Sequence, residues 1–525
     1  MSDGARMARR ASTVAGFTLV SRVLGYLRDL TLAYVFGAGA ALDAFVAAQT
    51  IPNVFRRLVA EGTLMVAFVP MMAEARERGG KAAMRALLGA VLGGLIPILV
   101  LLVGLGMVFP GVFVDAFASG FDGERQALAR HMTRIMMPFL ACVSLVAVAG
   151  GVLNSEGVFG PPAAAPILLN IGIIGAVAGG AGWIEPPVAA AAWGVLVGGV
   201  LQLGLQLPFL ARKAYGLRPR WDPHNPELRQ LAIRLGPAVL GVGVYQLNVV
   251  VIRQLASYLP GGQLSWYFYA TRLEEFALGV FAVSISIAAL PTLSRHAAAK
   301  DAAAFRRTFS RALRATQFIT VPSALALCGL AGPIVLTLFQ HGQFTVQDAR
   351  GTDELLRVMG LALVPIGAIR VMVPTYYAVG DTRLPVWAAL GSLATTAGLG
   401  AGLIGSFEIW GLVVATTAAA GVQALTLALW MRRRVFDSVG RAPVQRGGLG
   451  HLLRCAGAAA VSIGPVVLAS RWVDFVAAEA WARFGLLAGA VAVGAAGYLG
   501  AAHVFGIPEV QLLREAVGRR IRRAR

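Results

Sequence analysis

Apolar residues in this chain form long stretches that short polar segments separate. Most stretches contain about 20 residues or more, the length that an α-helix needs to cross the roughly 30 Å hydrocarbon core of a bilayer. The pattern therefore predicts an all-α integral membrane protein with about 14 transmembrane helices. The predicted helices cover residues 12–36, 42–74, 84–109, 132–154, 161–182, 188–211, 230–258, 264–292, 307–330, 353–379, 384–405, 409–431, 452–471 and 481–504.

The composition agrees with a membrane protein. Of the 525 residues 57% are hydrophobic and only 14% are charged, and the mean hydropathy is +0.70; soluble domains carry about 25% charged residues. The net charge of +20 does not predict a nucleic-acid partner, because the basic residues lie in short clusters between apolar stretches. The three cysteines, the six scattered histidines and Lys81 form no disulfide framework, metal motif or Walker A motif, so neither a metal nor a bound nucleotide is predicted.

The basic clusters lie in alternate loops. About 30 Lys and Arg residues fall on one side of the membrane and about five on the other, so the positive-inside rule predicts that both termini are cytoplasmic. An even number of helices agrees with this. Arg22 and Arg28 interrupt the first apolar run, and no convincing small-residue cleavage site follows it. We therefore expect this segment to be retained rather than removed as a signal peptide.

The chain resembles itself at an offset of about 220 residues. Ala67-Phe68-Val69-Pro70 matches Ala288-Ala289-Leu290-Pro291, and Pro110 matches Pro333. The repeat predicts two six-helix lobes, which are parallel because six is even, with a substrate cleft between them near the membrane midplane. The predicted domains are 1–220, 221–440, and a third segment of two further helices and a basic tail over 441–525.

Arginines lie deep inside the first two apolar stretches, at Arg22, Arg28, Arg56 and Arg57. A charge at the centre of a spanning helix costs about 2.5–3.5 kcal/mol on insertion scales, so the cluster would cost roughly 10 kcal/mol if it faced lipid. We expect it to face a hydrated cavity that suits an anionic, phosphorylated ligand, because guanidinium groups bind phosphate with two hydrogen bonds. Arg28 lies about 120° round the helix from Arg22, so both reach one site only if the helix bends, as Gly25 permits.

Internal ion pairing is the alternative role for these arginines. Arg28 can pair with Asp29, either Arg56 or Arg57 with Glu61, and Arg272 with Glu275. Arg22 has no acidic neighbour in its own turns. The acidic residues either orient arginines or bind a proton or cation; they are Asp29, Asp43, Glu61 and Glu275. Arg370, deep in the 353–379 helix, is a further candidate for ligand binding or gating.

The same residues carry a resemblance to a known family. Ser21-Arg22-Val23-Leu24-Gly25 with Arg28-Asp29, then Asp43-Ala44-Phe45, and Pro52-Asn53 through Arg56-Arg57 to Glu61, resemble the amino-terminal signature of the MurJ (MviN) lipid II flippases. These belong to the multidrug/oligosaccharidyl-lipid/polysaccharide exporter superfamily. Similar motifs at Arg272-Leu273, Glu275-Phe276 and Gly380-Asp381-Thr382 extend the resemblance over nearly the whole chain.

The resemblance implies a transporter of the bacterial cytoplasmic (inner) membrane and not an enzyme. Its substrate would be lipid II, a polyprenyl-diphosphate-linked peptidoglycan precursor, moved from the inner to the outer leaflet by alternating access for cell-wall biogenesis and cell shape. By motif, the substrate-binding residues are Arg22, Arg28, Arg56 and Arg272. The supporting or ion-coupling residues are Asp29, Asp43, Asn53, Arg57, Glu61, Glu275 and Arg370.

Two residues depart from the family pattern. Thr271 stands where relatives often have Asp, which puts a charge-relay role there in doubt, and Gln343 stands where a basic residue is common. No cofactor is expected beyond the membrane potential or a coupling monovalent cation. The polyprenyl chain would stay in the bilayer, with the last two helices as its groove, and cell-wall synthesis proteins are candidate partners.

Three other functions remain open at this point. A cation-coupled drug exporter of the same superfamily would favour acidic and aromatic cavity residues, which the excess of arginine contradicts. An exporter of another polyprenyl-linked glycan has the same charge requirement, and only the amino-terminal motif argues against it. A membrane scaffold for cell-wall synthases that does no transport would have dispensable buried arginines.

Overall fold

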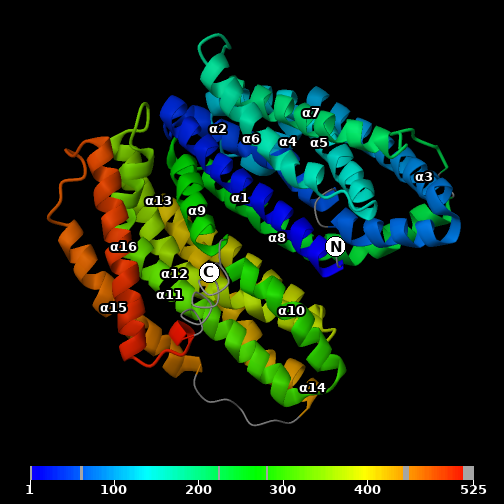
Figure 1. Cartoon of the computed structure of the whole chain (residues 1–525). Helices are drawn as coiled ribbons and strands as arrows, with labels where there is room; N and C mark the ends of the chain where they lie inside the picture. Colours follow the sequence, from blue (N-terminus) through cyan, green and yellow to red (C-terminus); the bar gives the residue numbers. More distant parts are fainter. Residues whose placement is uncertain (1–2, 60–62, 223–224, 280–281, 441–447, 512–525) are drawn as a thin grey trace. The chain divides into compact units, whose positions relative to one another are not determined.

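The computed structural model describes residues 3–59, 63–222, 225–279, 282–440 and 448–511, with side chains except at 3–11, 59, 63–66, 234, 237–240 and 282–284. These residues form helices, with no β-strand among them (Figure 1). The helices are α1 (Asp3–Phe36), α2 (Ala40–Val59), α3 (Thr63–Val108), α4 (Pro110–Ala118), α5 (Gly123–Ser155), α6 (Gly160–Gly180), α7 (Ala189–Arg212), α8 (Pro226–Ser257), α9 (Gln263–Gly279), α10 (Ala282–Ala298), α11 (Ala302–Phe339), α12 (Val346–Ala378), α13 (Arg383–Met431), the π-helix η1 (Arg432–Phe436), α14 (Asp437–Val439), α15 (Gly448–Ser470) and α16 (Ala480–Val504).

Every predicted helix has a helical counterpart, but some bounds differ. The predicted helix 42–74 corresponds to residues of α2 and α3, and 264–292 to residues of α9 and α10; residues 60–62 and 280–281 lie outside the described residues. Two continuous helices contain a break: α3 at Gly79-Gly80, where Gly80 has a φ of 60°, and α13 at Glu408, with a φ of 49°. A glycine tolerates this left-handed conformation because it lacks a Cβ.

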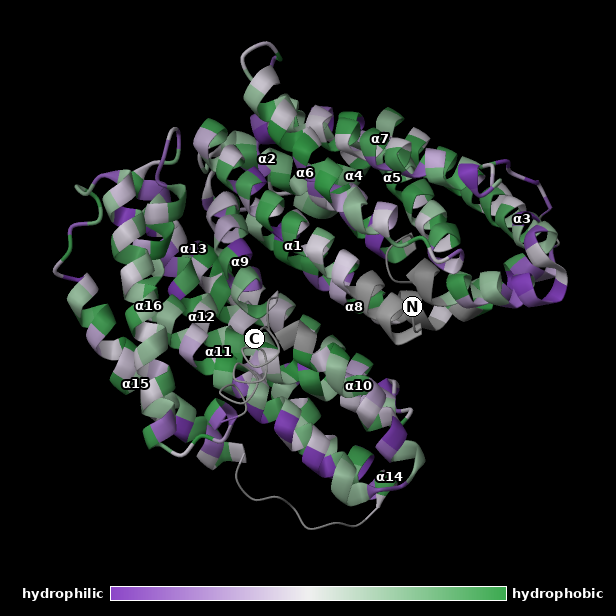
Figure 2. Ribbon diagram, viewed as in Figure 1, coloured by the Kyte–Doolittle hydropathy of each residue, from purple (hydrophilic) through white to green (hydrophobic). Residues whose placement is uncertain are grey.

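Nine helices in the described residues are long and apolar enough to cross a membrane. The predicted count of about 14 spans stays a prediction. Figure 2 shows hydrophobic residues along the helices and hydrophilic residues gathered near one end of α3 and around α14. Helix α4, which was not predicted, has only nine residues and is too short to span a bilayer by itself.

The chain forms two compact units, one of residues 1–265 with 341–344, the other of residues 266–340 with 345–525. In the first unit, α6 packs on α1 and α7, α5 packs on α2, α3 and α7, and α8 packs on α2, α3 and α4. In the second unit, α11 packs on α12 and α15, and α15 and α16 lie side by side (Figure 1). The predicted lobes, which end at residues 220 and 440, were derived from the sequence repeat. They do not coincide with these two compact units, and they stay a prediction.

Helix bounds repeat at the offset expected from the sequence. Helix α5 ends at Ser155 and α12 at Ala378 (378 − 155 = 223). The turns that follow these helices contain Gly157, with a φ of 77°, and Gly380, with a φ of 80°. The same backbone conformation therefore recurs at the same place in each repeat, where glycine is the residue that adopts it without strain.

Small residues allow close helix packing in the first unit. A Cβ at Gly172 of α6 would lie 2.7 Å from the Cα of Gly198 of α7, and a Cβ at Gly194 would lie 2.6 Å from the Cα of Ile173. Such distances exclude any larger residue at these two glycines. This is the packing that apolar helices use where the surrounding lipid provides no hydrophobic driving force.

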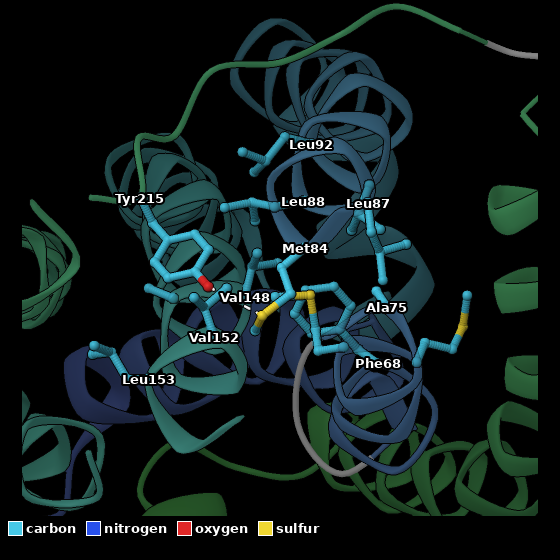
Figure 3. Packing of buried hydrophobic residues seen from close by; sticks show 14 of the residues in the cluster. Phe68, Ala75, Met84, Leu87, Leu88, Leu92, Val148, Val152, Leu153 and Tyr215 are labelled. Atoms are coloured by element: carbon cyan, nitrogen blue, oxygen red, sulfur yellow. Dashed lines mark hydrogen bonds between the residues drawn. The ribbon is translucent and has the colours of Figure 1, made fainter. Parts of the chain in front are cut away.

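An apolar cluster joins α3, α5 and α7 at one end of the first unit (Figure 3). Tyr215, just after α7, inserts its ring into this cluster; its hydroxyl contacts the Met84 sulfur at 3.1 Å and donates to Glu156 Oε1 at 3.0 Å. Burial and the Glu156 carboxylate raise the pKa of Tyr215 to about 12, so it remains a neutral donor.

Candidate functional site

Arg28 on α1 is the predicted site residue whose side chain is held from two helices. Its Nε and Nη2 donate to Asp29 Oδ1 at 2.9 and 2.7 Å, and its Nη1 donates to Asn170 Oδ1 of α6 at 3.2 Å. Asn170 in turn donates to the backbone carbonyl of Ser21 at 3.1 Å. The predicted Arg28–Asp29 pair is therefore present, and a third side chain from another helix fixes its orientation.

Sequence reasoning missed Asn170. It is 5% exposed and is a single amide in the apolar run of α6. Gly25 of α1 lies beside this amide, since a Cβ there would be in ordinary contact with Asn170 Nδ2 at 3.7 Å. A lone polar residue inside a spanning helix is the signal that could have identified it.

Arg22 differs from Arg28. It is exposed, and among the described residues it has no hydrogen bond or ion pair. Helix α1 continues without a break at Gly25, so the two arginines point to different faces of α1 in this conformation. The bend that would bring both to one site is not present here.

Helix α2 carries four of the predicted residues described by the structure, three of them near its end. Asn53, Arg56 and Arg57 are each half-buried in the turns that follow Pro52. The Arg57 guanidinium lies over the Tyr245 ring of α8, 5.9 Å from its centroid, within cation–π range. Glu61, and with it the predicted pairing to Arg57, lies outside the described residues.

Asp43 is completely buried at the start of α2. Its carboxylate accepts the backbone N–H groups of Gly262 and Ser265 at 2.6 and 2.7 Å, and the Ser265 hydroxyl at 2.5 Å. These donors lie at the amino terminus of α9, where a carboxylate is favourable because the first backbone N–H groups have no partner within the helix. In this structure Asp43 joins α2 to α9, and its hydrogen bonds go to this segment rather than to a predicted arginine.

Arg125 is a second buried charge that sequence reasoning missed. Its Nε donates to Asp122 Oδ2 and its Nη1 to the carbonyl of Leu259, both at 2.9 Å. Asp122 caps α5 by accepting the backbone N–H of Arg125, and these hydrogen bonds lower the pKa of Asp122. Arg125 thus fixes the same connection to α9 that Asp43 holds.

The second unit holds the other predicted charges. Arg272 Nη1 donates to Glu275 Oε2 at 2.9 Å, and its guanidinium lies 4.8 Å from the Phe268 ring centroid. The i, i+3 pair expected as a structural alternative is therefore formed. Arg370 of α12 is exposed, and its carbonyl accepts from the Ser286 hydroxyl at 2.5 Å. The structure also contains a buried acid on α9, Glu274, which sequence reasoning did not assign.

Comparison with known proteins identifies the chain. A family model for lipid II flippase MurJ matches residues 32–478. The chain belongs to the MurJ family of lipid II flippases. It is 35% identical to the lipid II flippase MurJ of Burkholderia cenocepacia over 97% of this chain and 99% of that protein. It is 37% identical to the probable lipid II flippase MurJ of Haemophilus influenzae over 78% and 83% of the two chains.

Solved structures show the same fold. A lipid II flippase MurJ in an inward closed conformation matches with a TM-score of 0.78 at 24% identity, over 94% of this chain and 98% of that one. An inward-facing multidrug resistance transporter of the MATE family matches with a TM-score of 0.68 at 16% identity, over 79% and 95%. The chain is thus an all-α, multi-pass transporter of the bacterial inner membrane and not an enzyme.

Family membership decides among the alternatives that the sequence left open. It favours lipid II transport for peptidoglycan biosynthesis over drug export and over export of another glycan. Arg22 and Arg28 precede the matched residues 32–478, so their role has to be argued from their own geometry.

Proposed function

We propose that this chain moves lipid II from the inner to the outer leaflet by binding its diphosphate to arginines of α1, α2 and α9. The binding residues are Arg22, Arg28, Arg56 and Arg272. The observation that supports this most directly is Arg28, a guanidinium that is only 15% exposed yet keeps hydrogen-bonding capacity.

The donors of Arg28 can be counted. A guanidinium has five N–H groups, and the three hydrogen bonds to Asp29 and Asn170 use three of them. One N–H group remains on Nη1 and one on Nη2. A bidentate contact to one phosphate group needs two such donors. Asp29 and Asn170 therefore orient Arg28 without saturating it.

Arg22 can supply hydrogen-bond donors in addition to those of Arg28. It lies six residues from Arg28, about 9 Å along α1, and it has no partner among the described residues. A diphosphate carries about two negative charges and needs donors from more than one arginine when it leaves the headgroup region. A bend in α1 during transport would bring Arg22 to the diphosphate that Arg28 holds.

The remaining predicted residues have supporting or coupling roles in this proposal. Asn53 and Arg57 lie beside Arg56 on α2, and Asp43 fixes the start of α2. The driving force is the membrane potential, worth about 2.3 kcal/mol per charge for 100 mV, or a monovalent cation. The polyprenyl chain remains in lipid beside α15 and α16, both termini are cytoplasmic, and cell-wall synthesis proteins are the protein partners.

Complementation of a bacterial strain depleted of its own lipid II flippase tests the proposal. The unmodified chain should restore growth, and Arg22→Ala, Arg28→Ala and Arg56→Ala should each abolish it at normal membrane levels. Arg78→Ala is the matched control, because Arg78 is an exposed arginine of α3 that pairs with Glu74. Full growth of all three arginine variants would support the scaffold alternative instead.

Reporter fusions test the orientation separately. Fusions at residues 8 and 520 should both report cytoplasm, and a fusion within 260–263 should report periplasm. Opposite sides for the two termini would show that the number of spans is odd.

A further inference from the structure

Glu274 of α9 is a buried acid with no partner among the residues that the structure describes. Its side chain is 7% exposed, and among the described residues it forms no hydrogen bond or ion pair. It lies 11 residues after the first residue of α9, about 16 Å along the helix and therefore near the middle of a hydrocarbon core of about 30 Å. An unpaired ionised carboxylate is very costly in such a place, whereas the neutral acid is tolerated.

The neighbouring residues do not supply a compensating positive charge. Arg272 lies about 200° round the helix from Glu274, and its guanidinium is bound to Glu275. The charged group that acts on Glu274 most directly is the Glu275 carboxylate, which is repulsive. Glu274 therefore has an acidic neighbour whose charge Arg272 partly neutralises.

The helices packed against α9 within the second unit offer no partner either. Helix α11 contacts α9 through Phe339 and Tyr269, and it carries no charged residue between Phe318 and Phe339. Helix α12 contacts α9 through the Trp266 indole, which donates to Asp348 at 3.1 Å. The charged residues of its first turns are Asp348, Arg350, Asp353, Glu354 and Arg357; Asp353 and Arg357 bind each other, and Arg350 and Glu354 are exposed.

We propose that Glu274 is a proton-binding site whose occupancy is coupled to the Arg272–Glu275 ion pair. The inference rests on the proposed function, since it requires that the diphosphate engages Arg272. When Arg272 turns to the diphosphate, the Glu275 charge is no longer neutralised, and the repulsion favours the protonated form of Glu274. At a pH that leaves Glu274 ionised in the substrate-free protein, a proton from water then adds to a Glu274 carboxylate oxygen, so substrate binding takes up a proton and offsets part of the diphosphate charge.

A proton fits this site better than a metal cation does. Within the described residues no group of three or more His, Cys, Asp or Glu side chains could hold a metal ion. A cation such as Ca²⁺ needs six to eight oxygen ligands, whereas a proton needs one carboxylate. The coupling is reciprocal, so protonation of Glu274 strengthens diphosphate binding by the same factor.

Proton uptake by the purified full chain in nanodiscs tests this inference, with lipid II as the probe and a pH indicator in weak buffer. At an alkaline pH, where Glu274 of the substrate-free protein is ionised, the wild type should take up as much as one more proton per bound lipid II than Glu274→Gln does; protons bound by the diphosphate itself are common to both and cancel in the difference. The lipid II affinity of the wild type should also rise as the pH falls, by up to about tenfold per pH unit relative to the variant. Glu354→Gln, which removes an exposed carboxylate of α12, should behave as the wild type.

Two outcomes separate the inference from the function on which it rests. If the wild type does not bind lipid II, the proposed function fails. If both proteins bind lipid II with equal proton uptake, Glu274 is not the site and the inference is overturned. Glu274→Met provides a second neutral variant in case Glu274→Gln does not fold, and infrared spectra should show a protonated carboxyl band in the wild type that both variants lack.

Discussion

Arg28 and Arg272 carry the same charge but are held in different ways. Arg28 is positioned by its neighbour Asp29 and by Asn170, which comes from α6, 142 residues away in the chain. Two contacts of Arg272, with Glu275 and Phe268, lie on its own helix. Arg28 is therefore oriented by a side chain from a distant segment of the chain, whereas Arg272 has contacts within α9.

The repeat sharpens this contrast. Helix α8 has a place in the second repeat similar to that of α1 in the first, with ends 221 residues apart (257 − 36 = 221). At this offset Gly243 and Val249 stand where α1 has Arg22 and Arg28. The duplicated feature is the apolar pattern that forms helices, and the charged site is not duplicated with it.

The largest expected effect is at Arg28. Arg28→Ala should abolish flipping, and Arg28→Lys should remain at least about a hundredfold impaired, because an ammonium cannot hold Asp29, Asn170 and a phosphate in one plane. Flipping of fluorescent lipid II in proteoliposomes measures this. Near-normal activity of Arg28→Lys would show that only the positive charge at residue 28 is needed. The way in which Arg28 is oriented would then not distinguish it from Arg272.

Exchange of Arg272 and Glu275 is the next test. If pairing is the whole role of Arg272, the swapped protein should recover much of the activity that either single change removes, since a reversed pair keeps its attraction. We expect no recovery beyond Arg272→Ala, because the swap puts a carboxylate where the diphosphate should bind. Growth of the depleted strain with normal levels of the swapped protein would assign Arg272 to structure.

A smaller effect is expected at Asn170. Asn170→Ala should slow flipping about tenfold, equivalent to about 1.4 kcal/mol, because a hydrogen bond to a charged group is lost while the charge remains. Ser323→Ala, a polar residue of α11 bonded only within its own helix, serves as control. An unchanged rate in Asn170→Ala would mean that Asp29 alone orients Arg28.

The smallest effect is expected at Phe268. Phe268→Leu keeps an apolar side chain but removes the ring under Arg272, and a cation–π contact at a partly exposed site is worth about 0.5–1 kcal/mol. The apparent affinity for lipid II should change by about two- to fivefold. A change as large as that of Arg272→Ala would show that the ring, and not the ion pair, holds Arg272 in place.

The apolar pattern alone was enough to predict most of the helices, because each spanning helix must satisfy its backbone hydrogen bonds internally and cover itself with apolar side chains. The self-similarity of the sequence at an offset of about 220 residues agrees with the helix ends at Ser155 and Ala378. Family membership followed from motifs that the comparisons confirm.

Only the tertiary structure showed what each charge contacts. Asn170 reaches Arg28 and Asp43 reaches Ser265 across 142 and 222 residues of chain, and a hydrogen bond between distant segments depends on packing that no local spacing encodes. The sequence assigned a role to Glu275 but none to Glu274, and only the structure shows that Glu274 is the buried one of the two, because adjacent residues of a helix point about 100° apart. The sequence determined which charges the membrane contains, and the fold decided which of them are held, exposed or left without a partner.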